Sequence, residues 1–320
     1  EEYDLNISEW IISELASHNK KMDFDELLES LEPDEGPAAV REALGRLIAE
    51  GKVLRTKKGK LFLPGSRFGL FTGRLDVKKA GFAFLPDAEG DIFISEENKG
   101  GAMHGDLVVV RQLTPAETDR KREGVVVEIL EQKQTRLVGT LAGRYVRPDD
   151  ERFDEVRVSK KGTAGARDGT KVVVEIKRRA RDGVSAEGRI VEVLGRAGDA
   201  QVELKSLIRQ YDLPEDFPDE VQEEAERAAA CEISAEGRED WRGRNVFTID
   251  GADAKDLDDA VSIRRLDNGW ELGVHIADVA HYVAEGSRLD REALKRGASV
   301  YLADTVIPML PKALSNGACS

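Results

Sequence analysis

Residues 244–283 have the sequence RNVFTIDGADAKDLDDAVSIRRLDNGWELGVHIADVAHYV, in which strand-like segments flank a short loop dense in aspartate. VFTID leads into the loop, AVSIRRL leaves it, and Asn268-Gly269 turns the chain into a further strand, WELGVHIADV. The loop carries Asp250, Asp253, Asp256, Asp258 and Asp259. Because these carboxylates directly adjoin apolar strands, several are expected to share one pocket, where their mutual repulsion favours a bound cation.

The donors available to such a cation are oxygens alone, because no His or Cys pair stands at metal-ligand spacing. An oxygen-only donor set favours a hard divalent ion, Mg²⁺ or Mn²⁺, over zinc. Calcium is disfavoured because the loop lacks the DxDxDG spacing and the closing glutamate of a calcium-binding loop. Two hard ions beside a phosphate would activate water and stabilise the leaving oxygen of an in-line displacement. The loop therefore predicts metal-assisted chemistry at a phosphate.

Longer motifs surround this loop. A D-x-x-x-x-x-D-x-D-D pattern begins at Asp250, GVHIADVAHYV follows it, and SVYLADTVIPMLPKALSNGACS occupies residues 299–320. Together these motifs resemble the catalytic domain of the RNase II/RNase R (RNB) family. The resemblance implies a processive, Mg²⁺-dependent exoribonuclease that degrades single-stranded RNA from its 3′ end to nucleoside 5′-monophosphates. The order of the upstream segments is more similar to RNase R than to RNase II.

The resemblance also assigns roles to individual residues. Asp250, Asp256 and Asp259 would bind the metal, and Asp258 would most directly support the hydrolytic step. Tyr301 matches the family tyrosine that stacks near the RNA 3′ end, the alternative being a buried structural tyrosine. All of these roles are implied by matching motif positions.

Other polar residues nearby receive structural interpretations. Asp253 lies outside the family set and is expected to be solvated. His275, Asp278 and His281 are expected to pack in the core or to support the site from behind, since a lone strand histidine more often has a structural role. The family catalytic domain, including its catalytic arginine, continues beyond the motif that ends at Ser320. The chain is therefore expected to be an N-terminal portion with an incomplete active site.

The fold class expected from these patterns is multidomain α+β. Helical periodicity followed by a Lys-Lys-Gly hairpin predicts a winged helix, although a small protein-contact domain is an equal alternative. Runs of period two then predict two cold-shock or OB-type β-barrels, followed by a linker with an acidic helix and by the start of an RNB-type catalytic domain. The expected boundaries are 1–65, 66–131, 132–200, 201–245 and 246–320.

The first predicted barrel contains KAGFAFLPD (79–87) and DIFIS (91–95), which are similar to the two RNA-binding motifs of cold-shock domains. Phe82 and Phe84 are two residues apart and therefore share one face of a strand, and Phe93 should point outward between two core isoleucines. Three rings on one face would stack unpaired bases, the alternative being packing against a neighbouring domain. Ser95 departs from the family, which usually has histidine there.

The second predicted barrel, a degenerate copy, concentrates positive charge. Residues 136–200 carry 15 basic and 11 acidic side chains, whereas the 320-residue chain as a whole has a net charge of −14. The basic run Lys177, Arg178, Arg179 and Arg181 is expected to follow the phosphates of RNA, with Arg178 and Arg179 as the candidate contacts. The alternative is an ordinary solvated face.

The remaining composition excludes other classes of protein. No apolar run is long enough to cross a bilayer, and no signal-peptide pattern opens the chain, so a cytoplasmic protein with no membrane partner is expected. Cys231 and Cys319 lack metal spacing and cannot form a disulfide framework, and Cys231 is expected to be a small apolar packing residue. The protein is expected to be monomeric and to bind the 3′ end of single-stranded RNA. Ribosomal or RNA-decay partners are left open, and the rival function is a non-catalytic RNA-binding or regulatory protein.

Overall fold

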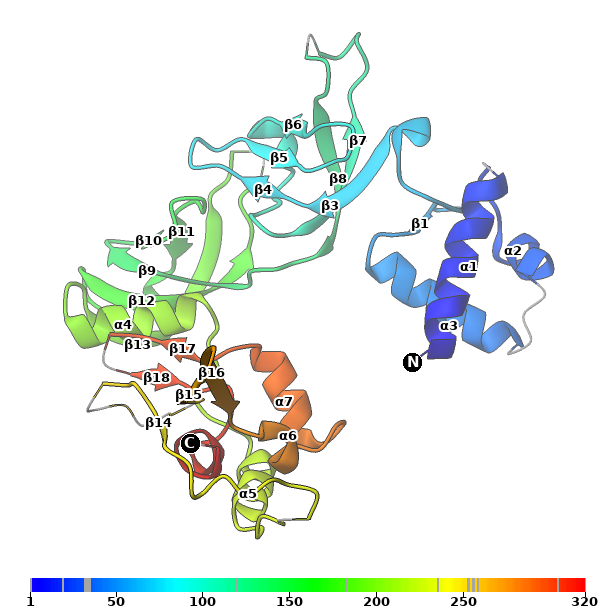
Figure 1. Cartoon of the computed structure of the whole chain (residues 1–320). Helices are drawn as coiled ribbons and strands as arrows, with labels where there is room; N and C mark the ends of the chain where they lie inside the picture. Colours follow the sequence, from blue (N-terminus) through cyan, green and yellow to red (C-terminus); the bar gives the residue numbers. More distant parts are fainter. Residues whose placement is uncertain are drawn as a thin grey trace. The chain divides into compact units, whose positions relative to one another are not determined.

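The structure, a computed structural model, describes residues 2–18, 20–31, 36–118, 120–181, 183–234, 236–251, 254, 257, 259–303 and 305–319. It divides into two compact units, Glu1–Ser206 and Leu207–Ser320, each of which is described separately below (Figure 1). Within the described residues, no helix has the length and apolar character needed to cross a membrane.

The first unit opens with helices α1 (Glu2–His18), α2 (Phe24–Leu31) and α3 (Gly36–Ala49) and a hairpin of β1 (Leu54–Arg55) and β2 (Leu61–Phe62). The four-residue spacing in α1 buries one helical face against α2 and α3, as expected. The buried cluster includes Ile7, Ile11, Leu15, Leu27, Val40, Leu44 and Leu47. The observed elements follow the predicted order, while the winged-helix assignment stays a prediction.

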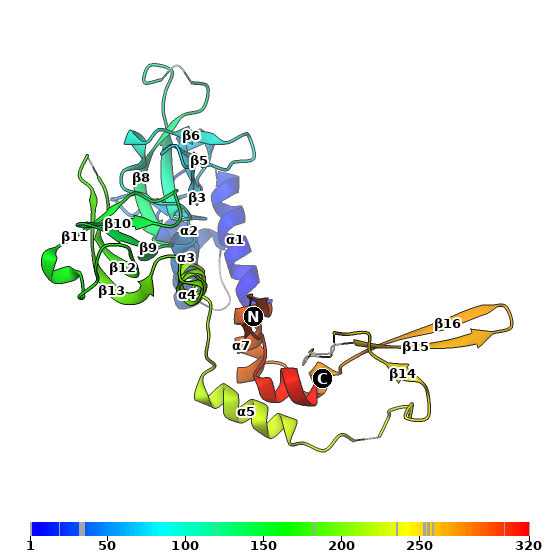
Figure 2. The same ribbon diagram turned by 90° about the vertical axis from the view of Figure 1, so that its left-hand side faces the viewer.

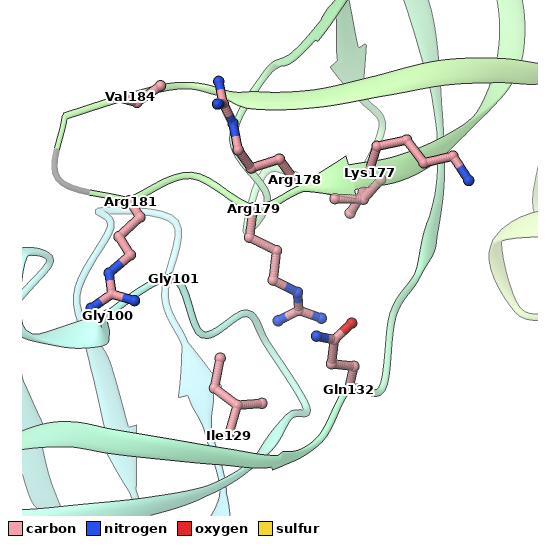
Figure 3. Close-up of a pocket in the computed structure, with 10 residues that line it drawn as sticks. Gly100, Gly101, Ile129, Gln132, Lys177, Arg178, Arg179, Arg181 and Val184 are labelled. Atoms are coloured by element: carbon pink, nitrogen blue, oxygen red, sulfur yellow. The ribbon is translucent and has the colours of Figure 1, made fainter.

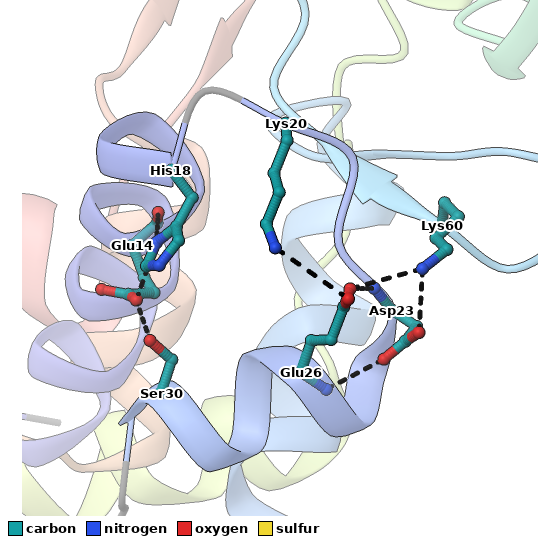
Figure 4. A network of polar contacts seen from close by, with 7 residues as sticks. All are labelled: Glu14, His18, Lys20, Asp23, Glu26, Ser30 and Lys60. Atoms are coloured by element: carbon teal, nitrogen blue, oxygen red, sulfur yellow. Dashed lines mark hydrogen bonds and ion pairs between the residues drawn. The ribbon is translucent and has the colours of Figure 1, made fainter.

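A reciprocal capping box starts α2 and ties it to the hairpin (Figure 4). Asp23 Oδ1 accepts the Glu26 N–H at 2.9 Å, and Glu26 Oε2 accepts the Asp23 N–H at 2.8 Å. Lys60 Nζ, from the hairpin, donates to Asp23 Oδ2 at 2.9 Å and to Glu26 Oε2 at 3.3 Å. The backbone N–H of Glu26 and then the Lys60 ammonium lower the pKa of Asp23, and the Asp23 carboxylate raises the pKa of Lys60. These ion pairs and backbone hydrogen bonds therefore fix the residue at which α2 begins and its position beside the hairpin.

The first β-domain consists of two sheets around one core rather than one closed barrel. Strands β3 (Leu70–Arg74), β7 (Leu107–Gln112) and β8 (Gly124–Glu131) form one sheet, and β4 (Asp76–Val77), β5 (Ala83–Leu85) and β6 (Ile92–Ile94) form the other. Leu75 lies between β3 and β4, where its N–H donates to the Asp106 carbonyl at 2.9 Å and its carbonyl accepts the Gly105 N–H at 2.8 Å. The chain changes sheet at this point.

The second β-domain closes fully, as predicted. Its strands are β9 (Arg136–Ala142), β10 (Tyr145–Pro148), β11 (Val156–Val158), β12 (Thr170–Arg178) and β13 (Ala186–Arg196), and they form a barrel in the order β10-β11-β13-β12-β9. Gly139 permits the closure, because a Cβ there would lie 2.3 Å from the Arg147 carbonyl oxygen. Helix α4 (Ala200–Gln210) follows, and its Val202 packs against Val138, Val173 and Leu194.

The second unit contains a three-stranded sheet and short helices. The sheet comprises β14 (Val246–Phe247), β15 (Asp259–Leu266) and β16 (Gly269–Ile276), with the predicted hairpin pairing Leu266 opposite Gly269. The other elements are α5 (Asp219–Ala229), α6 (Val279–Tyr282), α7 (Arg288–Arg296), β17 (Val300–Tyr301), β18 (Val306–Ile307) and η4 (Leu314–Ala318). Figure 2 shows β15 and β16 as a long hairpin extending from this unit.

The core of the second unit lies among its helices. It is formed by Val221, Ala225, Leu289, Leu310, Leu314 and Cys319. Cys231 takes no part, and the prediction that it packs as an apolar residue is wrong, because it is exposed beyond the end of α5, where its thiol donates to the Arg227 carbonyl at 3.4 Å.

Candidate functional site

Three phenylalanine rings lie together on the outer face of the β4–β6 sheet. Phe84 pairs directly with Phe93 across β5 and β6, and their ring centroids are 5.8 Å apart. The Phe82 ring lies 5.6 Å from each of the other two. Ile92 and Ile94, on either side of Phe93, are buried in the core. The predicted alternation is therefore present, and it leaves three half-buried rings with apolar surface facing outward.

Two cations border this aromatic cluster (Phe82, Phe84 and Phe93). The Arg120 guanidinium lies 3.9 Å from the centroid of the Phe93 ring, and Lys78 Nζ lies 6.0 Å from that of Phe84. Neither cation lies within the two motifs that are similar to those of cold-shock domains. Each lies near a ring in a cation–π arrangement, and each could also contact a phosphate when a base stacks on the rings.

Several basic side chains of the second barrel pair with acids of the same strand or of a neighbouring strand. Arg178 Nη2 lies 3.1 Å from Glu187 Oε1, and Glu175 accepts from Lys177 at 2.7 Å and from Arg189 at 2.8 Å. The Lys177 and Arg189 hydrogen bonds lower the pKa of Glu175 to about 2. The Arg178 side chain nevertheless stays 58% exposed and can reach a ligand. The barrel surface therefore carries interspersed positive and negative side chains rather than a purely cationic face.

Arg179 has a different environment from Arg178. Its side chain is 12% exposed and forms an ion pair with Asp106 of the first β-domain, whose side chain is fully buried. Arg179 Nη2 also donates to the Gln134 carbonyl at 3.0 Å. If Arg179 contacts RNA as predicted, the RNA must compete for its guanidinium N–H groups with Asp106 and the Gln134 carbonyl.

Two grooves flank the place where the β-domains meet. One, of about 450 Å³, is shown in Figure 3 and is lined by Gly100, Gly101, Ile129, Gln132, Ile176, Lys177, Arg178, Arg179, Arg181 and Val184. The other, of about 900 Å³, extends from Val77 and Ser95 of the first β-domain to Tyr145 and Phe153 of the second barrel. Concave, partly polar surface thus connects the two β-domains.

The aspartate loop is described only in part. Asp250 and Asp259 are exposed, and both offer carboxylate oxygens, the donor type that fits a hard divalent cation. Asp253, Asp256 and Asp258 lie outside the described residues. Across the residues that are described, no group of three or more His, Cys, Asp or Glu side chains could hold a metal ion.

The shared pocket expected for these carboxylates stays a prediction, because three of the five aspartates lie outside the described residues. Apolar side chains of the neighbouring β14–β16 sheet and of the segment beside it are exposed as well. The exposed set includes Phe247, Ile249, Ile263, Trp270, Leu272, Val274 and Ile276.

The other predicted residues of this unit lie near its surface. Tyr301 in β17 is exposed, so the alternative of a buried structural tyrosine is wrong. His275 is half-buried, with Nε2 at 2.9 Å from Ser262 Oγ and its ring 5.1 Å from that of Trp241. Asp278 is exposed and accepts from Arg238 at 2.6 Å, a bond that lowers its pKa.

His281 is exposed on α6, and its ring lies 4.9 Å from that of Tyr282. Core packing is therefore wrong for Asp278 and His281, while support of the site stays a prediction for them and for His275.

Comparisons with known proteins identify the class. The RNB domain model matches residues 238–320, the cold shock domain model matches 145–218, and the Ribonuclease B OB domain model matches 73–129. These matches define an RNB-domain protein with cold-shock and OB modules ahead of the RNB segment.

Curated relatives narrow the class. Ribonuclease R of Thermotoga maritima is 42% identical over 88% of this chain and 41% of its own length. Ribonuclease R of Acidithiobacillus ferrooxidans is 36% identical over 98% of this chain and 73% of its own, and that of Escherichia coli is 36% identical over 98% and 40%. The chain belongs to the ribonuclease R family, and it spans about two fifths of the length of the T. maritima and E. coli relatives.

Solved structures show the same similarity. Mycoplasma genitalium RNase R in complex with ribose-methylated single-stranded RNA matches with a TM-score of 0.65 and 25% identity, covering 78% of this chain and 41% of that one. Yeast Ssd1, a pseudonuclease, matches with a TM-score of 0.58 and 20% identity over 85% and 40%, a similarity of fold alone.

Asp106, which forms the ion pair with Arg179, is not among the residues predicted from the sequence. A signal was available, because GDLVVVRQL in the first domain parallels GTKVVVEIK in the second. Asp106 occupies the position that Thr170 has in the second copy, two residues before a buried valine run. A charged side chain at the start of a buried strand, where the other copy has a neutral one, indicates a specific ion-pair partner.

Proposed function

We propose that this sequence belongs to an exoribonuclease that hydrolyses single-stranded RNA processively from its 3′ end and releases nucleoside 5′-monophosphates. The observation that carries the proposal is the D-x-x-x-x-x-D-x-D-D pattern from Asp250, inside the segment that matches the RNB domain. Single-stranded RNA as the ligand is supported by the aromatic cluster and by the M. genitalium RNase R, whose structure holds such RNA.

The β-domains would bind the RNA upstream of its reacting end. Bases would stack on Phe82, Phe84 and Phe93, since every base offers a π-face irrespective of sequence. Arg178, which remains exposed, and Arg120, beside Phe93, would contact phosphates. Binding of this kind tolerates any sequence, as a processive degradative enzyme requires.

The acidic loop would carry the chemistry. Asp250, Asp256 and Asp259 would hold Mg²⁺, with Mn²⁺ as an alternative, through carboxylate oxygens. A hard divalent ion bound there supplies charge stabilisation at the phosphate and an activated water. Asp258 would support the hydrolytic step directly, and Tyr301, exposed on β17, would stack on the terminal nucleotide. We further propose a monomeric, cytoplasmic protein.

The rival is a non-catalytic RNA-binding protein. The aspartate spacing argues against it, because a pure RNA binder gains nothing from clustered carboxylates where a phosphate must lie. The two functions are separated by 5′-labelled single-stranded RNA, Mg²⁺ and the Asp258→Asn variant of the complete protein that contains this sequence. Asp253→Asn is the matched control, because it removes a neighbouring charge outside the motif. The proposal expects degradation to be abolished by the first change and retained with the second.

A further inference from the structure

The contact between the two β-domains contains a buried ion pair with a full set of hydrogen bonds. Asp106 accepts the Met103 N–H at 2.8 Å and the Lys133 N–H at 2.9 Å, in addition to the Arg179 guanidinium. Arg179 donates in turn to the Gln134 carbonyl. The pair therefore connects three segments: the loop before β7, the linker between β8 and β9, and the end of β12.

Close backbone packing accompanies the pair. Gly101 has a φ of +86°, and a Cβ at that position would lie 2.9 Å from the Ala180 carbonyl oxygen. The first domain thus approaches the segment after β12 nearly as closely as two backbones can. Gly101 and Arg181 line both flanking grooves, so this contact separates the two concave surfaces.

Burying an ion pair removes both charges from water, a cost that their mutual attraction offsets only where the pair is well hydrogen-bonded. A buried ion pair contributes little net stability compared with apolar residues of the same volume, but removing one partner leaves an uncompensated charge. The linker has its Lys133 N–H and its Gln134 carbonyl bound to the two members of the pair, so it cannot move independently of either domain. The pair therefore specifies one arrangement of the two domains.

We propose that the Asp106–Arg179 pair is a positioning element that holds the two β-domains as one body, so that RNA on the aromatic cluster continues over the second barrel. The inference rests on the proposed RNA-binding function. Two rigidly held sites bind one strand with an effective concentration that a flexible linker would lower. The pair acts through the domains and does not itself touch RNA, which assigns Arg179 a role different from that of Arg178.

The test compares oligonucleotides that occupy one domain or both. Fluorescence anisotropy is measured with labelled oligouridylates of about 4 and about 20 nucleotides, since an OB fold covers roughly 4–16 nucleotides. Arg179→Gln should weaken binding of the longer strand about tenfold and leave the shorter one unchanged. Arg147→Gln is the matched control, because Arg147 is exposed and its partner Glu155 belongs to the same domain. It should change neither strand by more than about twofold. Equal weakening of both strands by Arg179→Gln, or of neither, would overturn the proposal.

Hydrogen exchange separates a loosened contact from a misfolded domain. In Arg179→Gln, exchange at the Lys133 amide should accelerate, while amides of Val172 and Val174 in the barrel core stay protected. Gly101→Ala, which disturbs the same contact without removing a charge, should reproduce both effects. Unchanged exchange at Lys133 would refute the positioning role alone. Absence of binding of either strand by the unmodified protein would instead refute the proposed function and the role in RNA binding with it.

Discussion

Replacing Phe93 by leucine tests the aromatic cluster directly. The side chain points outward between two buried isoleucines, so leucine keeps the apolar cover of the sheet and removes only the ring. Phe93 contacts both other rings and carries the Arg120 guanidinium on its face. Its loss should therefore remove one stacking position and loosen a neighbouring cation.

The size of the effect follows from the stacking energy. One base on one ring contributes about 1–3 kcal/mol, which corresponds to a Kd about 5-fold to about 140-fold higher. Because the ring is neutral, the slope of log Kd against log salt should stay nearly constant while the affinity falls. This combination distinguishes lost stacking from lost charge.

The assay is anisotropy with a labelled oligouridylate at several salt concentrations. Tyr211→Leu serves as the control, since Tyr211 is an exposed ring outside both β-domains. A Kd for Phe93→Leu within about twofold of the unmodified protein, or equal losses in both variants, would refute base stacking on this face.

Three further results are expected. Arg178→Gln should weaken RNA binding at all sequences and reduce the salt slope by about 0.7, because one phosphate contact is lost; an unchanged slope in the same titration would count against it. The Arg296 side chain is 2% exposed and pairs with Glu292 at 2.9 Å. Arg296→Met should therefore destabilise the second unit by about 3–5 kcal/mol, because it leaves the buried Glu292 carboxylate unpaired. Amide exchange in α7 should become faster, and unaltered exchange would contradict this. His104 accepts from Arg152 at 2.7 Å, and burial and then the Arg152 charge lower its pKa below 6.5, so its neutral form is favoured on folding. The free energy of unfolding should thus fall as pH drops below 6.5, and it should fall less in His104→Gln. If the unmodified protein and His104→Gln lose the same melting temperature between neutral and mildly acid pH, the effect is disproved.

Local periodicity predicted the parts of the fold that depend on neighbouring residues. The outward Phe82, Phe84 and Phe93 follow from a period of two, and the β15–β16 hairpin follows from its turn residues. The helical face of α1 is predictable for the same reason. In each case the residues that decide the structure lie within a few positions of one another.

Pairing between distant residues could not be predicted in this way. A basic run around Arg178 predicts a cationic surface, but two of its acidic partners are distant in sequence, because Glu187 lies on another strand and Asp106 in the other domain. The exposure of Cys231 likewise depends on where α5 ends. The surroundings of Asp250 depend on what covers the β14–β16 sheet, which strand periodicity alone does not specify.

The most direct test of the central claim is the degradation of RNA itself. The complete protein that contains this sequence is mixed with single-stranded RNA labelled at its 5′ end, with Mg²⁺ present, and the products are resolved by length. The proposed function predicts that full-length RNA is converted to short 5′-terminal end products with few intermediates, as processive degradation from the 3′ end requires. This conversion should be abolished in Asp258→Asn and preserved in Asp253→Asn. RNA that stays intact with the unmodified protein, or that is shortened equally by Asp258→Asn, would contradict it.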